Sequence, residues 1–164
     1  MATLTVTPDQ DAIVGEVQIG APPERVFQAL TDPRQLLKWW GQTGLYRCTD
    51  WQTDVRVGGK WKSVGRGDTG VEFTVEGEYL ELDPPRALAY TWRSSWAQFR
   101  ESRVRWELIP QASGTLAKIR HSGLSGDPEA MKSYSGGWPR VVAWMKAFVE
   151  TGETVDTRKP VSAA

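Results

Sequence analysis

The sequence predicts an α+β domain in which a curved antiparallel sheet of about seven strands wraps round a long C-terminal helix. Three observations point to it. Residues 138–150 place large apolar side chains on one broad stripe with the period of an α-helix. Between residues 47 and 121, apolar and polar residues alternate in runs separated by hairpin-length turns. Strands joined by short turns pair antiparallel, and one face of such a sheet can cover the stripe.

The last helix is expected to begin near Trp138. Pro139 suits a first helical position, where its missing N–H costs nothing, and Gly152 lies where a helix usually ends. Residues 129–134 are expected to form at most a separate short helical turn. A Pro directly after Gly-Trp therefore indicates a late or kinked start to the final helix.

The chain before the sheet reads as one strand and two short helices. Residues 11–19 alternate with the period of a strand, and Pro23 and Asp32 each mark the start of a short helix. Residues 1–10 and 153–164 are polar and are expected to be flexible tails. A single domain over residues 11–152 follows.

Alternation in the strands assigns many aromatic residues to the inner face of the sheet. Gly77 lies in the middle of such a run and predicts a sharp bend or a bulge. The aromatic residues expected on inner faces, with one from the final helix, are Trp61, Phe73, Tyr79, Tyr90, Trp92, Trp106 and Trp138. Nine Trp in 164 residues suggest a wide interior lined with flat surfaces.

Composition excludes several classes of protein. Twenty basic and 20 acidic residues give a net charge of zero, which argues against a general nucleic-acid binder. The single Cys48 allows no internal disulfide or cysteine zinc cluster. No apolar run approaches the roughly 20 residues of a membrane span. We expect a soluble, cytoplasmic protein without a cofactor or a bound metal.

Catalytic patterns are weak. No Gly-x-Ser-x-Gly elbow is present, and a metal site would need His121 to recruit carboxylates that the inner faces hardly offer. Cys48 reads as a partly buried thiol and not as a nucleophile. On the outer face, basic residues at 103, 105, 118 and 120 interleave with acidic ones, which favours a solvated, salt-bridged surface.

A set of short motifs resembles the helix-grip superfamily, also called START, SRPBCC or Bet v 1-like. Within it the chain is similar to bacterial proteins related to the Hsp90 ATPase activator homologue. The resemblance runs from about Ile13 to Glu150, and the residues that carry it are Pro23-Glu24-Arg25-Val26-Phe27, Thr31-Asp32-Pro33, Trp39-Trp40-Gly41, residues 54–59, residues 75–79, Asp83-Pro84-Pro85, His121-Ser122-Gly123 and Gly137-Trp138.

The resemblance implies a seven-stranded sheet round a C-terminal helix with a cavity between them. It leaves function open, because the superfamily includes lipid and hormone carriers, polyketide cyclases and members without a known role. The family name comes from eukaryotic co-chaperones that carry an additional domain. This chain of 164 residues has no room for one, so Hsp90 activation is not expected.

Two interpretations of the aromatic set stay open: a dry core, or the wall of a ligand pocket. Polar side chains on the same faces, such as Ser63 and Ser102, favour the pocket. The ligand-binding residues expected from the sequence are Trp39, Trp61, Phe73, Tyr79, Tyr90, Trp92, Trp106, His121, Trp138, Val142 and Met145.

Three functions follow from these patterns. The preferred one is a binder of a hydrophobic or aromatic small molecule. The alternatives are a polyketide cyclase-like enzyme, with His121, a tyrosine or Glu81 as acid or base, and a co-chaperone-like module for a protein partner. For His121 itself, either a core histidine bonded within the protein or the principal polar contact of the ligand is compatible with the sequence.

Overall fold

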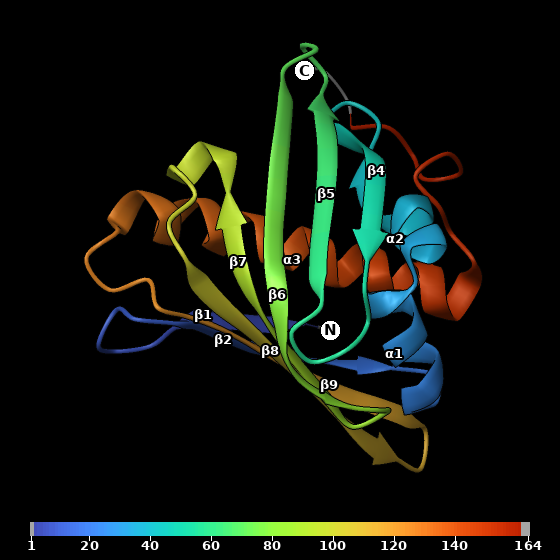
Figure 1. Cartoon of the computed structure of the whole chain (residues 1–164). Helices are drawn as coiled ribbons and strands as arrows, with labels where there is room; N and C mark the ends of the chain where they lie inside the picture. Colours follow the sequence, from blue (N-terminus) through green and yellow to red (C-terminus); the bar gives the residue numbers. More distant parts are fainter. Residues whose placement is uncertain (1, 162–164) are drawn as a thin grey trace.

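The computed structural model describes residues 2–161 and shows one curved sheet, two short helices and one long helix (Figure 1). The strands are β1 (Thr3–Val6), β2 (Ile13–Ile19), β3 (Gly41–Gln42), β4 (Tyr46–Thr53), β5 (Lys60–Gly67), β6 (Glu72–Asp83), β7 (Ala87–Ser94), β8 (Ser102–Gln111) and β9 (Gly114–Ser122). The helices are α1 (Pro23–Thr31), α2 (Pro33–Trp39) and α3 (Pro128–Thr151), with a short 3-10 turn, η1 (Ser95–Ala97). The predicted α+β class and the two short helices are confirmed, with nine strands in this part of the chain in place of about seven.

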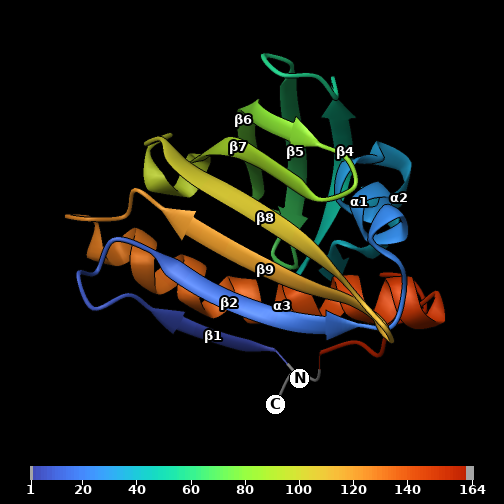
Figure 2. The ribbon, with the colours of Figure 1, turned by 90° about the horizontal axis from the view of Figure 1, so that it is seen from below.

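The strands lie in the order β1-β2-β9-β8-β7-β6-β5-β4-β3, and every neighbouring pair is antiparallel. Seen from below, β4 and β5 cross the direction of β8, β9 and β2 at a steep angle (Figure 2). The sheet thus curves round a concave face. That face holds the core and the cavity described below.

The ladder between β6 and β7 is interrupted at Gly77, where the sequence predicts a bend or bulge. The indole Nε1 of Trp61 donates to the backbone oxygen of Thr91 (3.2 Å), and the Glu78 N–H donates to the Thr91 hydroxyl (2.9 Å). A Cβ on Gly77 would lie 1.9 Å from that Thr91 oxygen. Glycine is therefore required by the close approach of the neighbouring backbone.

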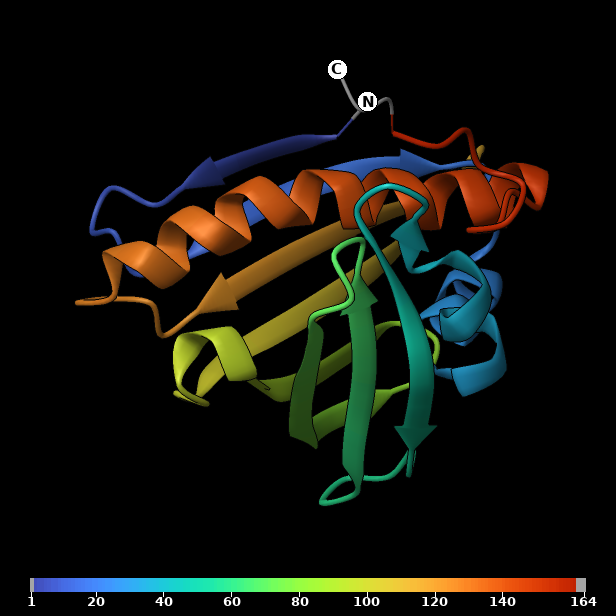
Figure 3. The same cartoon turned by 90° about the horizontal axis from the view of Figure 1, so that it is seen from above.

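Helix α3 crosses the concave face of the sheet as one continuous helix (Figure 3). Its first turn is capped by the Asp127 carboxylate, which accepts from the N–H of Ala130 (3.2 Å), and it ends at Gly152 in the left-handed region. The expected start near Trp138 is wrong. Pro139 lies inside the helix with its ring exposed, on the side away from the sheet, where a missing backbone bond is tolerated.

The expectation of a loose N-terminal tail is wrong for residues 3–6. They form edge strand β1, which pairs with β2 in the register Leu4 to Gly15. The reason is a short alternation, because Leu4 and Val6 pack against the core while Thr3 and Thr5 are exposed.

The segment after α3 is likewise not loose over residues 155–158. Val155 is buried and its N–H donates to the backbone oxygen of Lys38 (2.7 Å). The Arg158 guanidinium, only 6% exposed, donates to the backbone oxygens of Trp39 (2.9 Å) and Gly41 (2.5 Å). Val155 and Arg158 thus anchor this mainly polar segment against the end of α2.

The inner and outer faces of the strands agree with the alternation in the sequence. Side chains predicted to point inward, such as Trp61, Val104 and Ile119, are buried, and their neighbours along each strand are exposed. Helices α1 and α2 lie together at one end of the sheet (Figure 1), where Trp39 of α2 donates its indole N–H to the backbone oxygen of Ala29 in α1 (2.8 Å).

Candidate functional site: an aromatic cavity

A cavity of about 420 Å³ lies between the sheet and the middle of α3. It receives side chains from β4, β5, β6 and β7, from η1 and from the residue after α2. Its wall consists of Trp40, Tyr46, Cys48, Ser63, Val71, Phe73, Val75, Trp92, Trp96, Ser133, Tyr134, Gly137, Trp138, Arg140 and Val141. Trp40, Trp92 and Trp138 are buried at the inner wall, whereas Val71 and Trp96 are 66% and 45% exposed at the mouth. The cavity is therefore closed inside and open at one rim.

Aromatic rings in contact with one another form most of this wall. Trp92 lies 5.5 Å from Trp138 and 6.3 Å from Trp40, measured between ring centroids. Towards the mouth, Phe73 lies 5.5 Å from Trp96, which lies 6.2 Å from Tyr134. Such rings present flat, apolar faces and hold one another in place, so the wall suits a planar apolar molecule.

The wall has few polar groups, and both of its tyrosine hydroxyls are hydrogen-bonded within the protein. The Tyr46 hydroxyl accepts from the Trp40 indole (3.1 Å), and the Tyr134 hydroxyl bonds to Ser94 (2.6 Å). Burial raises the pKa of both phenols, and it raises the pKa of the Cys48 thiol to about 12. All three are therefore neutral at pH 7. The Cys48 thiol is buried in the structure.

Arg140 is the only residue in the wall that carries a charge at neutral pH. It is exposed on α3 at the mouth of the cavity. Within residues 2–161 it forms no ion pair with any carboxylate. Its charge favours ionisation of the Tyr46 phenol, although burial acts more strongly and in the opposite direction on that pKa.

The structure separates the sequence-predicted site residues into three groups. Phe73, Trp92 and Trp138 line the cavity. Trp61, Tyr79 and Tyr90, together with Trp92, line a smaller void of about 20 Å³ near α2, which is too small for an organic ligand. The remaining five pack in the core and line neither space: Trp39, Trp106, His121, Val142 and Met145.

His121 is bonded at both ring nitrogens. The Trp138 indole donates to Nδ1 (2.9 Å), so in the neutral ring Nε2 carries the proton and donates to the Ser102 hydroxyl (2.7 Å). The Ser102 hydroxyl in turn donates to the backbone oxygen of Trp92 (3.3 Å). The side chain is fully buried, and burial lowers its pKa to about 3. This geometry favours the interpretation of His121 as a core residue that orients Trp138.

Glu81, an inward acid candidate in the sequence, lies on the outer face. A register shift between Tyr79 and Glu81 inserts one extra residue into β6, and the side chain then forms an ion pair with Arg105 (2.9 Å). With Glu81 outside and His121 engaged, the cavity wall contains no carboxylate and no histidine.

Several wall residues were missed from the sequence. The alternation and helical periodicity place Trp40 at the end of a short helix and Arg140 on the polar side of the final helix, whereas Ser133, Tyr134 and Gly137 precede the predicted start of that helix. The capping Asp127-Pro128 pair was the signal that could have revealed it, because Asp at an N-cap followed by Pro at the first position starts a helix.

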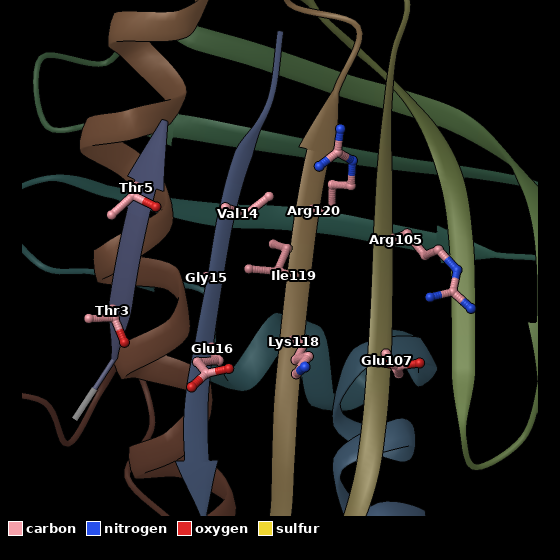
Figure 4. A pocket seen from close by; sticks show the side chains of 10 residues that line it. All are labelled: Thr3, Thr5, Val14, Gly15, Glu16, Arg105, Glu107, Lys118, Ile119 and Arg120. Carbon is pink, nitrogen blue, oxygen red and sulfur yellow. The ribbon is translucent and has the colours of Figure 1, made fainter. Parts of the chain in front are cut away.

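A second hollow, of about 460 Å³, lies on the outer face of the sheet over β1, β2, β9 and β8 (Figure 4). Its wall carries charges of both signs, from Glu16, Arg105, Glu107, Lys118 and Arg120. Figure 4 shows the Arg105 guanidinium pointing away from Arg120, in keeping with its ion pair to Glu81. Interleaved charges of this kind form a solvated surface, as the sequence predicts.

Within residues 2–161, none of the helices combines the length and the apolar character needed to cross a membrane. In the same residues, no three His, Cys, Asp or Glu side chains are grouped closely enough to hold a metal ion.

The fold and its cavity agree with comparisons to known proteins. Residues 20–150 match the family described as Activator of Hsp90 ATPase homolog 1-like protein. The chain belongs to this family. No curated protein matches it. The family assignment confirms the resemblance seen in the sequence motifs.

Solved structures of similar proteins have the same fold. Protein CV1439 from Chromobacterium violaceum is 30% identical, with a TM-score of 0.77 over 85% of this chain and 97% of that chain. CalU16 from Micromonospora echinospora is 21% identical, with a TM-score of 0.64 over 93% and 85%. DynU16, described as a protein in the dynemicin biosynthetic locus, is 22% identical, with a TM-score of 0.69 over 88% and 49%. The last two likenesses show the fold alone.

Proposed function

We propose that this protein binds a planar, hydrophobic small molecule in the cavity between the sheet and α3. The observation that carries the proposal is the cavity of about 420 Å³ with seven aromatic side chains in its wall and an open mouth. Ligand pockets of proteins typically measure about 300–1,000 Å³ and have mainly apolar walls with few polar groups. The family fold, with a helix across a curved sheet, supports a cavity at this place.

Binding is favoured over catalysis by the chemistry of the wall. General acid–base catalysis needs a group that gains or loses a proton near neutral pH. The phenols and the thiol of the wall have raised pKa values, and Arg140 stays protonated at neutral pH. CalU16 and DynU16 share the fold, and the dynemicin locus that DynU16 is described with is biosynthetic, which supports a small organic molecule as the ligand.

The test is the binding of N-phenylnaphthylamine, an uncharged aromatic dye, followed by NMR of the indole N–H groups. We expect shifts at the indoles of the wall, Trp40, Trp92 and Trp138, and little change at Trp39 and Trp106, which lie outside it. No shift at saturating dye, or shifts only at the residues outside the wall, would overturn the proposal.

A blocking variant sharpens the result. Ser133→Phe places a ring at the mouth of the cavity, whereas Lys132→Phe places the same ring on the adjacent exposed position, outside the wall. The first variant should weaken dye binding about ten-fold or more, and the second should not. Equal affinity of the two variants would show that the dye enters elsewhere. In a separate experiment, native mass spectrometry of the purified protein would identify a natural molecule bound to it.

A further inference from the structure

Arg140 differs from most arginines of this chain. Most of the others form an ion pair with a carboxylate, whereas Arg140 has none among the described residues. The helix itself offers none, because the positions three and four residues away are Gly136, Gly137, Ala143 and Trp144. An exposed cation without a partner is ordinary on a surface. Here it stands at the mouth of an apolar cavity.

Arg140 lies in the part of α3 that lines the cavity. It follows Gly137 by three residues and precedes the buried Val141, and all three belong to the wall. Tyr46 on β4 also belongs to the wall, and the charge of Arg140 favours ionisation of its phenol. No carboxylate lies in the wall to neutralise it. The charge of the wall is therefore positive, while the rest of the wall is mainly apolar.

Building on the binding function proposed above, we propose that the ligand is a planar aromatic anion. Its ring system lies among Trp40, Trp92 and Trp138, and its carboxylate, sulfonate or similar acid group lies at the mouth beside Arg140. The guanidinium presents planar N–H donors that match such an acid group. A cationic ligand would be repelled at the same place, and a neutral one would gain nothing from the charge.

The expected effect of the charge is modest, because the mouth is wet. Ion pairs that are open to solvent contribute little, and salt screens them. We therefore expect a preference of about three- to ten-fold for the anion that depends on Arg140. The aromatic wall supplies the rest of the affinity, and the charge selects between ligands of the same shape.

The experiment compares two dyes that share one aromatic skeleton. Anilinonaphthalene sulfonate carries an anionic group, and N-phenylnaphthylamine lacks it. Arg140→Gln should weaken binding of the sulfonate about three- to ten-fold and leave binding of the neutral dye within about two-fold. Lys132→Gln removes the same charge from an exposed position of α3 outside the wall and should change neither affinity. High salt should reduce the effect of Arg140→Gln on the sulfonate.

The outcomes separate this inference from the proposed function. If the neutral dye binds and Arg140→Gln affects both dyes equally, or neither, the inference is overturned and the binding function stands. If Lys132→Gln weakens the sulfonate as much as Arg140→Gln does, a general surface potential is responsible and the inference is again overturned. If neither dye binds to the wild-type protein, the proposed function itself fails.

Discussion

Lowering the pH from about 7.5 to about 5 should destabilise this fold through a single side chain, His121. In the folded protein its ring is fully buried, bonded at both nitrogens, and held at a pKa of about 3. In the unfolded chain an imidazole titrates near 6.5. Between these two values the unfolded state binds a proton that the folded state does not. The stabilising contribution is therefore complete above about pH 6.5 and is lost as the pH falls towards 3.

Over most of this pH range, the change in the free energy of unfolding depends only on protonation of His121 in the unfolded chain. At pH 5 an imidazole with a pKa near 6.5 is almost fully protonated in the unfolded chain, which lowers the free energy of unfolding by about 2 kcal/mol. At about pH 7.5 the same contribution is below about 0.1 kcal/mol. A change of about 2 kcal/mol is a large share of the roughly 5–15 kcal/mol that stabilises a typical domain.

The assay is urea unfolding of the wild type and of His121→Gln at several pH values. Glutamine can accept from Trp138 and donate to Ser102, but it does not titrate. Carboxylates with lowered pKa values, such as Asp32, are present in both proteins, so the difference between the two profiles isolates the imidazole. The wild type should lose about 2 kcal/mol more than the variant between pH 7.5 and 5.

A direct observation decides the matter even if the variant does not fold. His121 is the only histidine of the chain, so the NMR signals of its ring protons can be assigned without ambiguity. Those signals should stay unchanged down to about pH 5 in the folded protein. A titration near pH 6.5 in the native state would refute the assignment of a neutral, doubly bonded ring.

Three further predictions follow from other parts of the molecule. Arg158→Ala removes the guanidinium that donates to two backbone carbonyls and should lower the free energy of unfolding by about 1–3 kcal/mol, whereas the exposed Lys159→Ala should not. Equal urea midpoints would contradict this. Gly136→Ala and Gly137→Ala should each stabilise α3 by about 0.5–1 kcal/mol, because alanine favours a helix more than glycine does and the added Cβ meets no atom within 4 Å. Only Gly137 lies in the cavity wall, so only Gly137→Ala should weaken dye binding. Cys48, with a pKa raised to about 12, should react with iodoacetamide at pH 8 far more slowly in the folded than in the unfolded protein, and similar rates would show that the thiol is accessible.

The sheet and its inner face could be predicted from the sequence because each strand carries its own alternation. Trp61, Val104 and Ile119 point inward for a reason that is local to their strands. The predicted side of the sheet is wrong for Glu81, because Gly77 predicts a bend or bulge in β6 but does not show that the register with β7 shifts between Tyr79 and Glu81. The sequence does not predict the anchoring of Arg158 for a similar reason, since two of its acceptors, the backbone oxygens of Trp39 and Gly41, lie more than a hundred residues earlier in the chain.

The site was predicted less well than the fold. Periodicity shows which side chains point inward, and it placed Phe73, Trp92 and Trp138 correctly on the concave face. It does not show where the sheet and α3 stand apart, because this depends on the summed volume of side chains from several elements. Hence His121 and Met145, on the same inner faces, lie in packed core. Helical periodicity puts Arg140 on the polar side of α3, yet its long side chain lines the cavity.

The composition of α3 also bears on the order in which the molecule assembles. Gly136, Gly137 and Pro139 make the middle of this helix weak in isolation, so its stability depends on docking against the sheet. The helix follows all nine described strands in sequence, and the sheet that it covers is built largely from distant pairings, such as β2 with β9. Formation of such pairings is slow. We therefore expect α3 to dock onto the aromatic face after the sheet has formed, and we expect mutations that weaken the helix to favour aggregation during refolding.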